Sequence, residues 1–529
     1  MSCEEIMVVP KSLPLLPEHT RSMHTKGLLI VLFFLGVYLL TAQGSIQTSD
    51  GMSMFLLTQS IAEKGSLSIE SARTDVLSEG KGEKFFSKYG VGQPLLAVPL
   101  YLAGVAVTNV SGIPKRFTTL FAVSLFNSII SSLVCIVLFF CAVEMGYSQR
   151  IALCVSSAYG MSTVAWHYSQ DFMSEPLTAL FFILALYLTL KAAAGSARSY
   201  FYVGCALGGA LLVRPASAVA VPCYLIFILL KEKDGERGRR LLQGLGYFLT
   251  GCVPFVAGVL WYNFIRFGSI ADAGYQSHGF TTPLWVGMAG HLITPGKSIF
   301  LYNPFLLITV VGFYDFIKAR PKEALLVCLI FLSHLVLYSK WDVWTGGMCW
   351  GSRFLLVTFP YLMVSAGVFL EKRGTFWRAV AIVLFLAGVI VQLPSLVVNV
   401  SRYHYTLRLQ YRDAMMDRLI YTAHDSPLIG QWKEVKKVIA DLKNRDYLKE
   451  LTSYATQQKS FTGAGDEELL KYGLALNVPN VWWVYLYLYG FPLRVILPLV
   501  CFLITIALIS GAGILRRVVS SSECEGKIQ

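Results

Sequence analysis

The chain has 529 residues, of which 55% are hydrophobic and only 15% are charged, and its mean hydropathy is +0.57. Because soluble proteins carry charges on about a quarter of their residues, this composition excludes an ordinary water-soluble protein and indicates a polytopic membrane protein. The formal net charge of +13 comes mainly from short loops between apolar runs. The positive-inside rule accounts for that excess, so we expect no nucleic-acid partner.

Apolar runs long enough to cross a bilayer recur along the whole chain. With residues 1–26 as a cytoplasmic tail, the short loops that hold Arg150, Lys318 and Arg373 fall on the cytoplasmic side, whereas the outer loops 168–174 and 340–352 are nearly free of Lys and Arg. This asymmetry sets the predicted orientation. We predict about twelve transmembrane helices, at 27–44, 117–142, 150–167, 175–192, 199–213, 216–230, 242–266, 299–316, 323–339, 353–370, 376–397 and 493–515.

One apolar run, residues 93–108, is short and is interrupted by Pro94 and Pro99. Counting it as a span would move the later basic loops outside, so we predict an interfacial or re-entrant helix on the outer side. The predicted fold class is an all-α polytopic membrane protein with a small, mostly helical extracytoplasmic domain. Its predicted parts are a cytoplasmic tail (1–26), a transmembrane domain (27–397) with one long outer loop (45–116), the extracytoplasmic domain (398–492), a last span (493–515) and a second tail (516–529).

Conspicuous polar residues follow the first span. Asp50 begins an amphipathic stretch, where an acid serves either as a helix cap or as a functional carboxylate. The run KFFSKYGVGQPLLAVP contains Lys88, Tyr89 and Gln93. Lys and Tyr favour the membrane interface, but a cation beside a glycine-rich turn also suits an anionic headgroup.

Two further strings place charge at the ends of spans. Asp171 and Glu175 lie one helical turn apart in DFMSEPL, where an acid before Pro176 is also ordinary chemistry for a helix start. Arg214 lies before Pro215, between two short apolar runs. A cation at membrane depth is costly, so we favour a functional role for Arg214 over simple snorkelling.

The most unusual string is KWDVWTGGMCWGSRFLL, which begins at Lys340. Aromatic belts explain its tryptophans, but not a glycine pair flanked by an acid and a base. Tryptophan faces and carboxylates suit sugar recognition, and Arg is the preferred bidentate partner of phosphate. We therefore list as candidates from this outer face Trp341, Asp342, Trp344 and Arg353, together with Lys297 from TPGKSIFLYNP and His278.

Together, six strings resemble the GT-C superfamily of membrane glycosyltransferases, in particular the bacterial branch similar to protein O-mannosyltransferases and lipid A aminoarabinose transferases. The strings are SKYGVGQPLLAVPLY, DFMSEPL, ALLVRP, TPGKSIFLYNP, WDVWTGGMCWGSRFLL and DSPLIGQW, and the resemblance extends from about residue 25 to 435. It implies a GT-C-like bundle whose catalytic domain is 27–397. It also implies transfer of a sugar, with inversion, from a polyprenyl-phosphate donor to an acceptor hydroxyl.

On this resemblance Asp50 is the general base, and the donor phosphate is bound by Arg353, Lys297, Lys88 and Arg214. The sugar or acceptor is bound by Trp341, Asp342, Trp344, Glu175, Asp171, Tyr89, Gln93 and His278. Many relatives have two adjacent acids in the first outer loop, where this chain has Ser49-Asp50-Gly51. A two-acid metal site is therefore not supported, and we assign no metal and no cofactor.

The expected partners are membrane lipids, the lipid-linked donor and a lipid, glycan or protein acceptor, at the extracytoplasmic face of a bacterial inner membrane. The main alternative is a secondary transporter or flippase of lipid-linked glycans, which would need charged residues near the bilayer midplane in broken helices. Arg214 alone fits that pattern. A polymerase or ligase that moves whole glycans and a non-catalytic assembly subunit are further alternatives.

Overall fold

The computed structural model describes residues 18–70, 76–231, 238–275, 278–456, 470–471 and 473–525. This part of the chain is almost entirely helical, which confirms the predicted all-α class. Its one sheet is a short antiparallel pair, β1 (Ser78–Glu79) and β2 (Phe85–Phe86), with Ser78 opposite Phe86. Most of the predicted N-terminal tail, the basic loop 232–237 and the last four residues lie outside the described residues.

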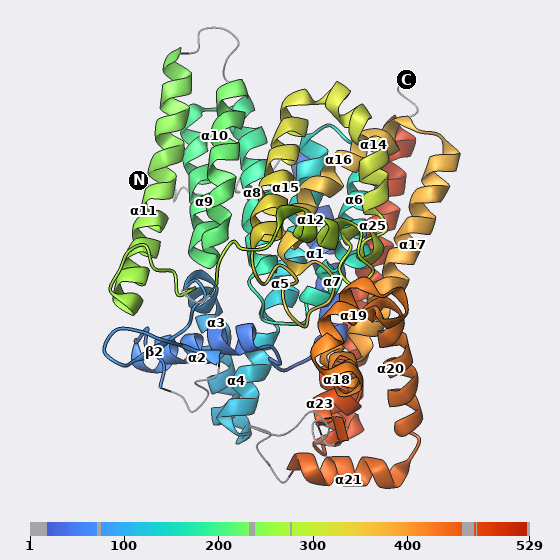
Figure 1. Ribbon diagram of the computed structural model, residues 1–529. Coiled ribbons are helices and arrows are strands. Elements are labelled where there is room, and N and C mark those ends of the chain that lie inside the picture. Colours follow the sequence, from blue (N-terminus) through green and yellow to red (C-terminus); the bar gives the residue numbers. More distant parts are fainter. Residues whose placement is uncertain are drawn as a thin grey trace, which may run out of the picture.

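Most of the long helices run side by side in one bundle, which fills the upper part of Figure 1. Within it α9 packs on α11, α1 on α25, α5 on α8 and α14 on α16. The bundle consists of α1 (Glu18–Thr41), α5 (Phe126–Glu144), α6 (Gln149–Ser162), α7 (Ala165–Tyr168), α8 (Glu175–Ala194), η2 (Ala197–Ser199), α9 (Tyr200–Val213), η3 (Pro215–Val219), α10 (Ala220–Lys231), α11 (Gly238–Phe267), α12 (Leu284–Leu292), α13 (Ile299–Tyr302), α14 (Leu306–Ala319), α15 (Pro321–Lys340), η4 (Arg353–Thr358), α16 (Phe359–Lys372), α17 (Thr375–Val397) and α25 (Leu493–Glu525).

Nine helical segments within the described residues are long and apolar enough to cross a membrane. Eight of them coincide with predicted spans, and the ninth is Gly92–Ser111, which covers the predicted interfacial helix. The other four predicted spans correspond to shorter helices: α6, η2 with α9, η3 with α10, and α13 with α14. The chain is therefore an integral membrane protein, and several of its bundle helices are too short to cross the bilayer alone.

A second layer lies at one end of the bundle, in the lower part of Figure 1. From the first long loop it contains α2 (Ser49–Lys64), the β1–β2 pair and α3 (Gly92–Ser111), and α3 packs on both α2 and α4 (Lys115–Ser124), the helix that begins the candidate span Lys115–Glu144. From the region after α17 it contains α18 (Val400–Tyr411), η5 (Arg412–Ala414), α19 (Met415–Tyr421), η6 (Ala423–Asp425), α20 (Pro427–Asp441), α21 (Arg445–Thr456), α23 (Leu474–Asn477) and α24 (Trp482–Leu488). The two segments predicted to lie outside the membrane thus meet at the same end of the molecule.

Candidate active site

A cavity of about 940 Å³ lies where this layer meets the bundle. Its volume is in the range of pockets that enclose small ligands, roughly 300–1,000 Å³. The walls come from segments far apart in sequence, including residues 46–50, 88–90, 213–219 and 337–354, and α18 contributes Ser401 and Tyr405. Part of the wall, from the end of α9, η3 and α15, is apolar and includes Val213, Pro215, Ala216, Ala218, Val219 and Leu337; charged and polar residues also line the cavity.

Asp50 lies in the first turn of α2, at the edge of this cavity. The helix begins here because the hydroxyl of Thr48 accepts a hydrogen bond from the Gly51 amide at 3.2 Å. The carboxylate of Asp50 forms an ion pair with Arg353 (Oδ2 to Nη2, 2.9 Å) and accepts a hydrogen bond from Ser49 Oγ at 3.3 Å. Burial opposes ionisation of Asp50, but Arg353, the Tyr89 hydroxyl and Lys88 outweigh it and lower its pKa. Asp50 is therefore an ionised carboxylate at neutral pH.

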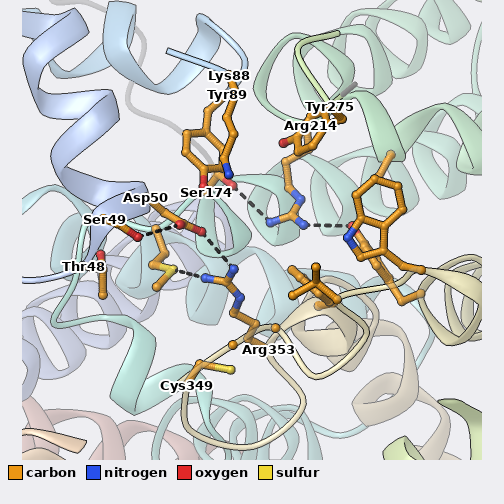
Figure 2. A pocket seen from close by; sticks show the side chains of 18 of the residues that line it. Thr48, Ser49, Asp50, Lys88, Tyr89, Ser174, Arg214, Tyr275, Cys349 and Arg353 are labelled. Carbon is orange, nitrogen blue, oxygen red and sulfur yellow. Dashed lines mark hydrogen bonds and ion pairs between the residues drawn. The ribbon is translucent and has the colours of Figure 1, made fainter. Parts of the chain in front are cut away.

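Arg353 reaches the cavity from a glycine-rich loop that precedes η4. Gly346, Gly347 and Gly351 all have positive φ values of 71°, 76° and 62°, which other residues rarely adopt. A side chain at Gly346 would also approach Arg353 Nε to 3.0 Å. The glycine pair noted in the sequence is thus needed to turn the chain beneath the guanidinium. Figure 2 shows Arg353 pointing from this loop toward Asp50.

Arg214 enters from the opposite side, at the break between α9 and η3. It has extended backbone (φ −141°, ψ 116°), as expected for a residue before proline, so α9 ends and the side chain turns into the cavity. Its guanidinium forms an ion pair with Glu175 Oε1 at 2.5 Å and donates to Ser174 Oγ at 3.1 Å and Tyr338 Oη at 2.9 Å. Glu175 is also 3.8 Å from Arg353 Nε. One buried carboxylate therefore holds both arginines.

Lys88 and Tyr89 descend from the loop before α3 and point toward Asp50 from above in Figure 2. Lys88 Nζ lies 5.5 Å from the centre of the Tyr89 ring. Burial and the neighbouring Asp50 carboxylate raise the pKa of Tyr89, so its phenol stays protonated and acts as a donor. Among the described residues, no carboxylate forms an ion pair with Lys88.

Two predicted sugar or acceptor ligands, His278 and Trp341, line the same cavity. Their ring centres are 5.7 Å apart, and His278 Nδ1 is 3.2 Å from Asp342 Oδ2. Asp342 itself is absent from the cavity wall; its backbone amide donates to Gly279, which anchors the loop that carries His278. Asp342 therefore orients His278 at the cavity rim.

The remaining predicted ligands are not in the cavity wall. Lys297 is fully buried, and its ammonium donates to the carbonyl oxygens of Gly347 and Cys349 at 3.1 and 2.9 Å. Trp344 packs in an apolar cluster with α18 and α19. The buried Asp171 accepts from the Phe172 amide, and Gln93 donates to the Phe172 carbonyl. Glu175 acts on the cavity through the arginines. Of these side chains, Lys297 and Glu175 directly hold residues that line the cavity, Gly347 and Cys349 in the first case and Arg214 in the second.

Several residues of the cavity were not identified from the sequence. Tyr275, Tyr338 and Phe354 line it, and Phe354 stacks on Tyr338 with ring centres 4.5 Å apart and the planes at 15°. The guanidinium of Arg214 lies 5.5 Å from the Phe354 ring centre. Burial raises the pKa of Tyr275 to about 12. Aromatic residues are common in the spans, so sequence alone gives no signal that singles these out.

The cavity thus brings one carboxylate and three cations together, and most of these side chains are largely buried. The pairs Asp50–Arg353 and Glu175–Arg214 are neutral overall, and Lys88 leaves one positive charge in excess. Such a site favours a singly charged anion, because cations act more strongly where water is excluded. Among the described residues, no three His, Cys, Asp or Glu side chains are grouped so that they could hold a metal ion.

Residues 116–262 match the family model of dolichyl-phosphate-mannose-protein mannosyltransferase. The match lies within the bundle and α4, and it confirms the resemblance to GT-C membrane glycosyltransferases. No curated protein matches the chain by sequence. Similar solved structures include ArnT from Cupriavidus metallidurans in the apo state (13% identity, TM-score 0.47) and bound to undecaprenyl phosphate (14%, 0.43), each with 87% of this chain and 86% of the other covered. The oligosaccharyltransferase of Archaeoglobus fulgidus in the apo form is also similar (12%, TM-score 0.42, 79% of this chain and 63% of the other).

Proposed function

We propose that this protein is a membrane glycosyltransferase that moves a sugar from a polyprenyl-phosphate donor to an acceptor hydroxyl, with inversion. The observation that carries the proposal is a single cavity at one end of the bundle in which Asp50 faces three cations, Lys88, Arg214 and Arg353. The family model matched by residues 116–262 is named for a dolichyl-phosphate sugar donor, which supports this donor class. The apolar wall suits a prenyl chain, and the cations suit its phosphate.

In the proposed reaction Asp50 accepts the proton of the acceptor hydroxyl while that oxygen attacks the anomeric carbon. The bond from this carbon to the phosphate oxygen breaks, and polyprenyl phosphate leaves with one more negative charge. Arg353, Arg214 and Lys88 stabilise the charge that develops on the phosphate, because they are already oriented in a site with little water. The rings of Trp341 and His278 form the surface on which the sugar or acceptor would pack.

Because Asp50 and Arg353 form an ion pair, binding of the donor would also change the pKa of Asp50. A donor phosphate that binds Arg353 competes with the Asp50 carboxylate, which then loses its strongest stabilising contact. The pKa of Asp50 rises as a result, and a carboxylate with a higher pKa is a better base. Asp50 therefore gains basicity only when the donor is bound.

We also propose that the cavity faces the extracytoplasmic side of a bacterial inner membrane, because the basic loops lie at the other ends of the spans. The acceptor is a lipid, a glycan or a protein that carries a free hydroxyl on that side. The transporter alternative is not favoured by the position of the cavity, which lies where the end layer meets the bundle and not at its middle.

The proposal is tested by transfer of radiolabelled sugar from a panel of polyprenyl-phosphate donors to endogenous acceptors in membranes. The wild type is compared at matched expression with Asp50→Asn and with Asp315→Asn, a control whose carboxylate pairs with Arg373 and does not line the cavity. We expect transfer by the wild type and the control and a loss of at least 100-fold in Asp50→Asn. Equal transfer by both variants would remove Asp50 from the mechanism. Donor flipping without transfer in proteoliposomes would favour the transporter.

A further inference from the structure

A group of amide side chains joins the loop that carries Asp50 to the domain that follows α17. Gln47 lies in this loop and is one of the residues that line the cavity. Its Nε2 donates to Ser45 Oγ at 2.9 Å and to Asn480 Oδ1 at 2.8 Å, and its Oε1 accepts a hydrogen bond from Asn399 Nδ2. All three of these partners are uncharged side chains, and two of them, Asn480 and Asn399, are over 350 residues away in sequence.

The distant partners are firmly held. Asn480 is fully buried, its backbone amide donates to the Val397 carbonyl at 2.7 Å, and its Oδ1 also accepts from Tyr485 Oη at 2.5 Å. Asn399 caps α18 by accepting from the Ser401 amide at 2.8 Å. The two asparagines therefore present fixed hydrogen-bonding groups to Gln47.

The loop itself has little structure of its own. Residues 43–47 form no backbone–backbone hydrogen bond with any described residue. Just before them, the end of α1 is held by the 482–483 segment: the Trp482 amide donates to the Ala42 carbonyl at 2.9 Å, and the indole of Trp483 donates to the Leu40 carbonyl at 3.0 Å. Just after them, Thr48 caps α2. Between these two anchors Ile46 packs in an apolar cluster with Met54 and Phe55, and the side chain of Gln47 makes the polar contacts that tie the segment to the domain after α17.

We infer that Gln47 is a positioning residue, through which the domain after α17 holds Asp50 in register with Arg353; this inference rests on the proposed function. Gln47 is three residues from Asp50 and does not contact its carboxylate, so its effect is on geometry. Displacement of a reacting group by about 1 Å can lower a rate on the order of 100-fold. The extracytoplasmic domain is therefore part of the catalytic unit, in addition to lending Ser401 and Tyr405 to the cavity wall.

The first arm of the test is hydrogen–deuterium exchange of the full-length protein, followed on peptides that cover residues 43–52. Gln47→Ala and Asn480→Ala are compared with wild type and with Gln59→Ala, a matched change on α2 whose side chain hydrogen-bonds Glu63 and Tyr101, outside the amide group around Gln47. We expect at least tenfold faster exchange of this segment in the first two variants and no change in the control. Unchanged exchange in Gln47→Ala would overturn the inference whatever the activity.

The second arm separates positioning from a general loss of structure. In Gln47→Ala we expect kcat to fall by about 10- to 100-fold with the donor KM within about twofold, since Lys88, Arg214 and Arg353 come from other elements. The acid limb of the kcat/KM profile, which reports the free enzyme, should move to higher pH, because a loosened Asp50 loses its contact with Arg353; a merely unfolded fraction would scale the profile without moving it. Wild-type kcat in Gln47→Ala, with Asp50→Asn inactive, would overturn this inference alone. A wild type that transfers no sugar would overturn the proposed function with it.

Discussion

Replacement of Glu175 by glutamine should destabilise the protein and disable the cavity together. The Glu175 side chain is only 2% exposed, and its carboxylate is 2.5 Å from Arg214 and 3.8 Å from Arg353. Glutamine keeps the volume but removes the charge. The guanidiniums of Arg214 and Arg353 then repel each other, because the carboxylate between them is gone. Arg353 keeps its ion pair with Asp50.

The magnitude follows from the burial of the pair. Removing one partner of a buried ion pair costs about 3–5 kcal/mol, because the other charge stays buried without compensation. Arg214 would still donate to Ser174 Oγ and Tyr338 Oη at 3.1 and 2.9 Å, so we expect the lower end, about 3 kcal/mol. Replacing both charges by apolar side chains is often nearly neutral. Glu175→Met/Arg214→Met should therefore be more stable than Glu175→Gln, yet equally inactive.

The free energy of unfolding is measured by titration with sodium dodecyl sulfate in mixed micelles, with tryptophan fluorescence as the signal. Glu371→Gln is the matched control, since Glu371 is exposed and accepts hydrogen bonds only from Ser148 among the described residues; it should change stability by less than about 0.5 kcal/mol. If Glu175→Gln costs no more than this control, or if the double variant is the less stable of the two, the ion pairs do not organise the cavity.

Three further outcomes are expected. Because Arg353, Tyr89 and Lys88 lower the pKa of Asp50, the acid limb of kcat/KM that reports the free enzyme should lie below about pH 4; a limb near pH 6 would contradict an ionised Asp50. Burial raises the pKa of Asp171 to about 6, so its contribution to stability is complete below about pH 4 and is lost as the pH rises through about 6. Asp171→Asn should therefore gain stability relative to wild type as the pH rises from about 4 to about 6 in unfolding titrations, and a pH-independent difference would refute this. Trp344→Ala should cost about 3–5 kcal/mol of stability, whereas Trp341→Ala should mainly raise KM, and the reverse pattern would show that the two roles are exchanged.

Much of the cavity could be predicted from the sequence, because several of its residues are charged side chains at positions where burial or membrane depth makes a charge energetically unfavourable. Arg214 at membrane depth and Arg353 after a glycine pair need a reason, and both point into the cavity beside Asp50. The orientation from Lys and Arg counts placed these residues at one face, although they span about 300 positions. The same pattern predicted the two segments that meet at that end of the bundle.

Side-chain direction was beyond reach of the sequence. Trp341 and Trp344 are three residues apart in the same string, yet the first lines the cavity and the second packs against α18 and α19. Lys297 has the composition of a phosphate ligand, but its ammonium binds backbone carbonyls of the glycine-rich loop. These outcomes depend on which helix packs behind each segment, and a single sequence does not specify that. Gln47 gave no signal, because an amide is unremarkable in a polar loop.

The two ion pairs explain how the fold accommodates two largely buried arginines in one cavity. Unpaired buried guanidiniums would destabilise the fold by several kcal/mol each, and each arginine here has a carboxylate partner. The two partners differ in what they can do. Glu175 is buried behind the arginines and stays with them, whereas Asp50 lines the cavity and can release Arg353 to an incoming phosphate. In the proposed reaction the same exchange binds the donor and frees the base, so the acceptor is activated only when there is a sugar to receive.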